Sequence, residues 1–153
     1  MIKIIASALT VMTGAALFGA SAAADTQIKA VFIEGAPKDQ FRFTNIGGCD
    51  LGPLTLTLDL STLEAGLVFD VTGAGAGVEV FQPLEILSGS NLINTVSAVA
   101  DGDTTVIFEL SAFPALETVS FSVDVDDTVR DSALGQIRIS DSEIRGAFVS
   151  VLG

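Results

Sequence analysis

The chain contains no histidine, tryptophan or tyrosine, and it has a single cysteine. The absence of histidine excludes Ser–His–Asp and Cys–His catalytic machinery, and with only one cysteine it also argues against a zinc centre. Any functional site must therefore be built from carboxylates, hydroxyls, amides and backbone groups. This inventory favours binding or assembly over catalysis, and we expect that the protein is not an enzyme.

Positive charge is scarce as well. Lysine and arginine total 7 against 19 aspartates and glutamates, which gives a net charge of -12. Such acidity disfavours nucleic acid and anionic membrane surfaces as partners, whereas it suits divalent cations. The length of 153 residues fits one domain, and no second composition regime interrupts the chain.

The first residues have the pattern of an export signal. Lys3 supplies one positive charge, Ile4–Phe18 is apolar, and small residues follow over Gly19–Ala24. The pattern predicts a signal peptide over residues 1–24 and a single mature domain over 25–153. The alternative is an uncleaved anchor helix, but the apolar stretch is shorter than the roughly 20 residues of a membrane span. We therefore expect cleavage after Ala24 and no membrane insertion of the mature chain. The predicted location is the periplasm, the extracellular space or the cell surface.

The single Cys49 has no partner within the chain, which excludes an intrachain disulfide. An unpaired cysteine in an exported protein indicates either an intermolecular bond or a buried thiol. We favour the buried thiol, because free cysteine is among the most buried residue types.

Alternating hydrophobic patterns predict strands and no helix in the mature chain. Leu54–Leu60 has leucine at every second position, which places one face on a core and the other in water. Clusters of Gly, Pro, Asn and Asp separate the patterns, and we interpret Gly73–Gly77 as a flexible hairpin connection. About eight or nine short strands predict an all-β, antiparallel, immunoglobulin-like β-sandwich. The other predicted strands are Ile28–Ile33, Phe41–Ile46, Leu67–Val71, Val78–Leu87, Thr104–Leu110, Val119–Val125, Ile137–Ile139 and Ile144–Leu152.

One strand pattern, Phe121–Thr128, runs into three clustered carboxylates. If Val123 and Val125 point inward, Asp124 and Asp126 share an exposed face about 6.5 Å apart along the strand. Calcium takes about six to eight oxygen ligands, which such acids supply in part. The alternative is a solvated acidic strand end that prevents edge pairing. The candidate calcium ligands are Asp124, Asp126, Asp127, Asp101 and Asp103, and Asp141 and Glu143 are further oxygen donors.

Several segments, taken in order, resemble one family. They are Phe32–Phe41, Asp59–Ser61, Ala65–Asp70, Gly75–Pro83, Asp101–Asp103, Phe121–Thr128 and Ser142–Ala147. Together they resemble exported bacterial proteins of the aggregation factor core type, which are similar to the core protein of sponge aggregation factors. The resemblance implies an extracellular, non-enzymatic module that self-associates. In the sponge assemblies such modules mediate calcium-dependent cell adhesion through glycans.

Three functional hypotheses follow. The first is an exported structural or adhesion module that forms homo-oligomers and is modulated by calcium. The second is a module that binds calcium or an extracellular glycan or cell-surface partner without self-assembly. The third is a small hydrolase that uses paired carboxylates, which the lack of aromatic platforms other than phenylalanine disfavours.

Overall fold

The computed structural model describes residues 27–35, 38–78, 80–129, 132 and 134–153. The predicted signal peptide over residues 1–24 lies outside the described residues. Within the described part of the chain, ten strands and one short 3-10 turn, η1 (Ser90–Leu92), make up the regular structure. No helix in this part is long and apolar enough to cross a membrane.

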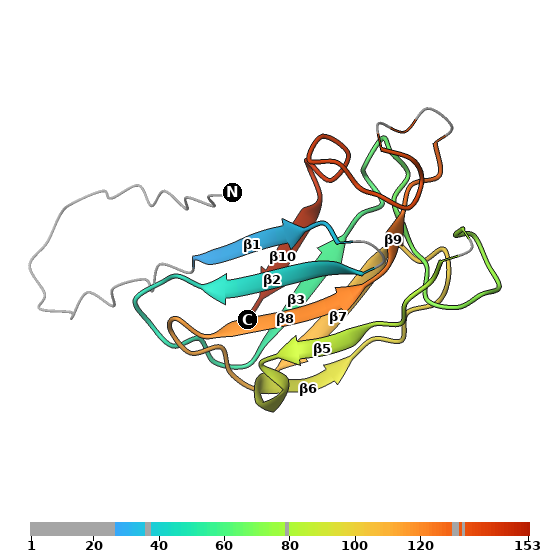
Figure 1. Cartoon of the computed structure of the whole chain (residues 1–153). Helices are drawn as coiled ribbons and strands as arrows, with labels where there is room; N and C mark the ends of the chain where they lie inside the picture. The colour runs from blue at the N-terminus through green and yellow to red at the C-terminus, as the bar shows by residue number, and fades with distance from the viewer. Residues whose placement is uncertain (1–26, 36–37, 79, 130–131, 133) are drawn as a thin grey trace, which may run out of the picture.

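Two four-stranded antiparallel sheets form the body of the molecule. In the first sheet the strand order is β1-β2-β8-β5, and in the second it is β10-β3-β7-β6. Figure 1 shows the two sheets stacked, with β9 at one end, where it pairs with β4 in a short two-stranded ribbon. The strands are β1 (Ile28–Ile33), β2 (Asp39–Asn45), β3 (Leu54–Asp59), β4 (Val68–Phe69), β5 (Glu85–Ser88), β6 (Ile93–Val96), β7 (Thr105–Leu110), β8 (Thr118–Val123), β9 (Val125–Asp126) and β10 (Phe148–Leu152).

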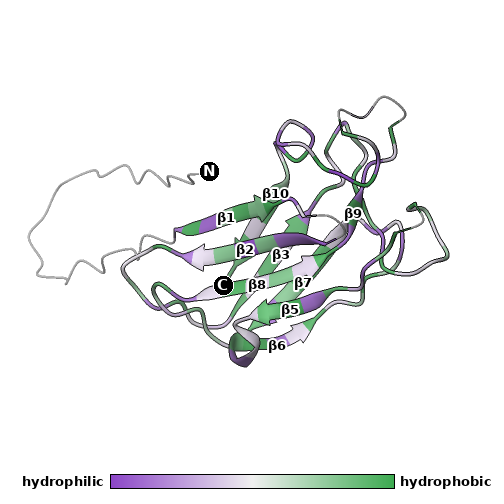
Figure 2. Ribbon diagram, viewed as in Figure 1, coloured by the Kyte–Doolittle hydropathy of each residue, from purple (hydrophilic) through white to green (hydrophobic). Residues whose placement is uncertain are grey.

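The core lies between the sheets, and period-two alternation produces it. In β3 the three leucines are buried and the residues between them are half-buried, as the alternation predicts. The alternating hydrophobic and polar bands along the strands are visible in Figure 2. Phe121 of β8 meets Phe108 of β7 across the interior, with ring centroids 4.8 Å apart. Full burial of each such ring stabilises the fold by about 1.5–3 kcal/mol.

The structure confirms the predicted all-β antiparallel sandwich, with ten strands where eight or nine were expected. Two predicted strands are shorter than expected, since Leu67–Val71 forms a strand only over Val68–Phe69 and Ile144–Leu152 only over Phe148–Leu152. Two others are largely wrong. Most of Val78–Leu87 forms no strand, and only Glu85–Ser88 pairs with β8. Ile137–Ile139 lies in a turn, where the Arg138 side chain pairs with Glu34. The pattern search also missed β6, whose four residues do not alternate in burial.

The prediction that Cys49 is a buried thiol is wrong, because its side chain is exposed. Cys49 lies in the loop between β2 and β3, and its backbone carbonyl accepts a hydrogen bond from Asn45 Nδ2 at 3.0 Å. The buried Asn45 side chain, and not the cysteine, anchors this loop in the protein.

Candidate metal centre

The site is built where the β4–β9 ribbon leaves the sandwich. The two strands pair antiparallel, with Val68 opposite Asp126 and Phe69 opposite Val125. Asp70 directly follows β4, and its backbone N–H donates to the carbonyl of Asp124 at 3.1 Å. This pairing brings Asp70 next to carboxylates that lie more than 50 positions further along the sequence.

The alternation of this segment is as predicted, but the prediction that its acidic face is exposed is wrong. Val123 and Val125 are fully buried in the core, and Asp124 and Asp126 point to the other face. That face is nevertheless covered, since Asp124 is 2% exposed and Asp126 is 1% exposed. The backbone of Val78 and Gln82 covers it: Val78 N donates to Asp126 Oδ2 at 2.7 Å, and Asp124 N donates to the Gln82 carbonyl at 3.3 Å.

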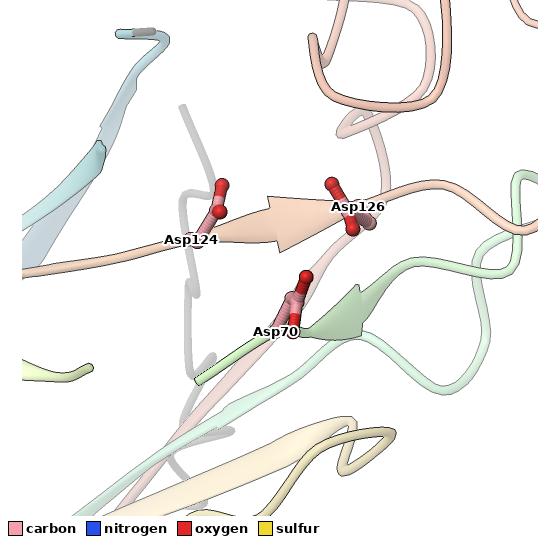
Figure 3. Close-up of side chains that lie close together, drawn as sticks. All are labelled: Asp70, Asp124 and Asp126. Carbon is pink, nitrogen blue, oxygen red and sulfur yellow. The ribbon is translucent and has the colours of Figure 1, made fainter. Parts of the chain in front are cut away.

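Three carboxylates converge in this covered position. One oxygen from each of Asp70, Asp124 and Asp126 lies within 4.8 Å of the other two. Figure 3 shows the Asp70 side chain reaching from the end of β4 toward β9, where the other two side chains lie. Among the described residues, no N–H or hydroxyl group donates to Asp70 Oδ2, Asp124 Oδ2 or Asp126 Oδ1, and each atom is almost inaccessible to solvent. Buried oxygens without a partner are costly unless a cation or a proton compensates them.

Burial and mutual repulsion of the carboxyl groups also shift their pKa values. Burial raises the pKa of Asp124 to about 7, with a further rise from the charges of Asp126, Asp39 and Asp70. Burial likewise raises the pKa of Asp126 to about 6. Burial raises the pKa of Asp70, a hydrogen bond between the Asp70 and Asp126 carboxyl groups opposes part of that rise, and the nearby Asp101 charge adds to it. The fold therefore concentrates carboxyl groups whose negative charge a shared proton or a cation would offset.

The donor set fits calcium. Carboxylates are ligands that calcium prefers, and calcium–oxygen distances are about 2.3–2.6 Å. Two ligands on opposite sides of one calcium ion are therefore roughly 5 Å apart, and the observed spread of up to 4.8 Å is compatible with that span. Magnesium retains several waters in a strict octahedron, which a cluster with almost inaccessible oxygens accommodates poorly.

Asp127 lies beside this cluster and is not one of the three converging residues. It is 1% exposed, and neither of its carboxylate oxygens meets a hydrogen-bond donor from the described residues. Its backbone N–H donates to the Gln136 carbonyl at 3.0 Å. The negative charge of Asp127 contributes to the raised pKa of Asp126. The predicted ligand is therefore a buried neighbour of the cluster.

Three other acidic residues stabilise turns, because their carboxylates accept hydrogen bonds from backbone N–H groups. They are Asp101, Asp103 and Glu143. Asp101 Oδ1 accepts from the backbone N–H groups of Val71 and Thr72, both at 2.7 Å. Asp103 Oδ2 accepts from Ala100 N at 2.8 Å. Glu143 Oε2 accepts from the backbone of the nearby Ser140 at 2.7 Å. The structure does not bring these three carboxylates into the cluster, and the exposed Asp141 is not part of it either.

Sequence reasoning missed Asp70 and Asp39. Asp70 interrupts the apolar run of Leu67–Val71 as Asp124 interrupts its own strand, but only the β4–β9 pairing shows that the two interruptions meet. Asp39 is buried at the start of β2, where its Oδ2 accepts from Val125 N at 3.2 Å. Its sequence neighbours Lys38 and Gln40 are polar, so no periodicity marks it as buried.

Comparisons of the chain with protein-family models, with curated proteins and with solved structures found no match. The family resemblance of the sequence segments therefore stays a prediction, and the functional argument depends on the geometry of the site.

Proposed function

We propose that the protein is a calcium-binding β-sandwich module without catalytic activity, and that Asp70, Asp124 and Asp126 hold the ion. The observation that supports this proposal is the convergence of three buried carboxylates, each of which also has one oxygen without an N–H or hydroxyl donor among the described residues. An isolated buried carboxylate is strongly unfavourable, and a cation provides the compensation that such a group requires.

The proposed ion has a structural role. It connects the end of β4 to β9, and these segments are far apart in the sequence. A ligand that binds only the folded state stabilises it by about 2.7 kcal/mol at a concentration 100 times its Kd. For a domain of this size that corresponds to a rise in Tm of roughly 8–15 °C.

The test is thermal unfolding of the wild-type protein in EDTA and in millimolar calcium, together with calcium titration by calorimetry. The variant Asp70→Asn removes one of the three converging charges, so it should unfold in EDTA at the wild-type temperature or above it, because repulsion is relieved. Calcium should then no longer raise its Tm. The matched control Asp141→Asn changes an exposed carboxylate outside the cluster and should keep the full calcium response. A wild-type Tm that is insensitive to calcium would contradict the proposal.

Self-association is a second candidate function, and one feature of the sandwich favours it. The edge strand β10 carries no charged residue in a chain of net charge -12. Its outward-facing Phe148 and Leu152 are exposed, the latter by 70%. An uncharged apolar edge is a template for pairing with another strand, and a second copy of β10 fits it without like-charge repulsion. An extracellular glycan or cell-surface partner, which the resemblance implies, stays a prediction.

A further inference from the structure

A short loop lies directly over the proposed calcium site. We call residues Thr72–Val78 the strap. Asp101 holds its first end by accepting hydrogen bonds from Thr72 N at 2.7 Å and from Thr72 Oγ1. Asp126 holds its last end, since Val78 N donates to Asp126 Oδ2 at 2.7 Å. Asp126, one of the proposed calcium ligands, therefore also holds the strap in place through this hydrogen bond.

The strap approaches the carboxylates so closely that only glycine fits at two positions. A Cβ atom added to Gly77 would overlap the Asp70 carboxyl group, and one added to Gly75 would overlap the Asp101 side chain. Neither glycine has a positive φ, so close approach is the constraint at both positions. The glycine-rich run, expected as a flexible hairpin connection, instead packs its backbone against two aspartates.

The strap also closes the site. One carboxylate oxygen of each of Asp70, Asp124 and Asp126 is almost inaccessible to solvent in this arrangement. A hollow of about 360 Å³ is lined by Asp70 and by five residues of the strap. Since one water takes about 30 Å³, this hollow has room for a hydrated cation. Because Gly77 packs against the Asp70 carboxyl group and the Val78 amide is bonded to Asp126, the strap covers both of these carboxylates.

We infer that the strap is a cation-dependent closure, which opens to admit calcium and is fastened over the site when calcium is bound. This inference rests on the proposed calcium site. Without a cation, the Asp70 and Asp126 carboxylates repel each other beneath the strap when both are ionised. Among the hydrogen bonds of the described residues, the bond from Val78 N to Asp126 is then the only one that holds this end of the strap. Bound calcium fixes both carboxylates and so preserves the surface on which the strap packs.

Amide hydrogen exchange of the wild-type protein, in EDTA and in saturating calcium, tests the inference. Exchange of the Val78 amide should slow by about tenfold or more with calcium, because its acceptor becomes fixed. The amide of Leu58 in the middle of β3 lies in the hydrogen-bonded sheet and should exchange at a rate that calcium changes far less. Equal protection of Val78 in both conditions would overturn the inference even where calcium binds.

The variant Gly77→Ala supplies an independent test. Its Cβ prevents the strap from closing over Asp70, so the calcium Kd should rise by about tenfold or more, in proportion to the lost fraction of closed protein. Gly52→Ala is the matched control, because a Cβ at Gly52 meets nothing within 4 Å. If the wild type binds no calcium, the proposed function fails and this inference fails with it. If the wild type binds calcium and Gly77→Ala binds it equally well, the closure alone is overturned.

Discussion

At the scale of single residues, the protein concentrates aspartates where water does not reach them. Asp39, Asp70, Asp124, Asp126 and Asp127 are all buried. Such groups have two ways to avoid an uncompensated charge: they bind a proton or they share a cation. The raised pKa values of Asp39, Asp70, Asp124 and Asp126 favour the binding of protons, and the geometry of three converging oxygens supports a shared cation.

The competition between proton and calcium gives a pH prediction. Burial raises the pKa of Asp39 and Asp124 to about 7, above the value near 4 in an unfolded chain. Between about pH 4 and pH 7 the folded protein therefore binds more protons than the unfolded chain, so its free energy of unfolding falls as pH rises. In EDTA, the urea midpoint should be higher at pH 5 than at pH 8.

Calcium should reverse most of this loss at pH 8, because it replaces the protons. Urea unfolding followed by circular dichroism at the two pH values, with EDTA or calcium, measures both effects. Asp124→Asn should show a weaker pH dependence in EDTA than the wild type. An EDTA midpoint that is unchanged or higher at pH 8 would contradict the prediction.

At the scale of elements, β8 connects the core to the site. It is a central strand, paired with β2 on one side and β5 on the other. Phe121 packs against Phe41, Phe43 and Phe108 with ring centroids 4.8–6.1 Å apart. The strand then continues through Asp124 into β9. The position of the carboxylates is therefore set by the packing of the aromatic residues that precede them.

Truncation of this aromatic centre should strongly destabilise the protein. Phe121→Ala removes a fully buried ring, and large-to-small changes of this kind cost about 3–5 kcal/mol. Phe148→Ala removes a phenylalanine that is 54% exposed, and it should cost less than about 1 kcal/mol. Chemical denaturation in calcium compares the two. Similar losses in both variants would show that the centre of the sandwich does not lie at Phe121.

At the scale of the whole molecule, the sandwich leaves four edge strands: β1, β5, β6 and β10. Charged side chains on two of them disfavour pairing with a strand of another copy, since β1 carries Lys29 and β5 carries Glu85. β10 pairs with β3 on one side only, and its inward Val149 and Val151 pack against the core. β6 and β10 both lack charged residues, but only β10 also exposes large apolar side chains, Phe148 and Leu152, which makes this edge the one to test for contact between copies.

Ser150→Lys should reduce self-association. Ser150 lies in the middle of β10 between the two inward valines, so a lysine there brings two like charges together in a β10–β10 pair. Light scattering after size-exclusion chromatography should find a wild-type oligomer, in calcium above all, and a smaller species for the variant. A strictly monomeric wild type at high concentration, with and without calcium, would rule out this second candidate function.

Local chemistry in the sequence determined the sandwich class and much of its core. Alternation needs no knowledge of distant partners, so Ile28–Ile33 was predicted with the bounds of β1, and Phe69, Phe108 and Phe121 were correctly expected in the core. The same alternation correctly placed Asp124 and Asp126 opposite the core valines.

The tertiary structure alone decided that this opposite face is covered. Asp70 meets Asp124 because β4 pairs with β9 (Figure 3), and the glycine-rich segment packs Gly77 against the Asp70 carboxyl group. Periodicity reports which side of a strand a residue occupies, but it carries no information on which segment packs there. Only that packing turned an apparently solvated acidic strand end into a buried, unpartnered cluster of carboxylates.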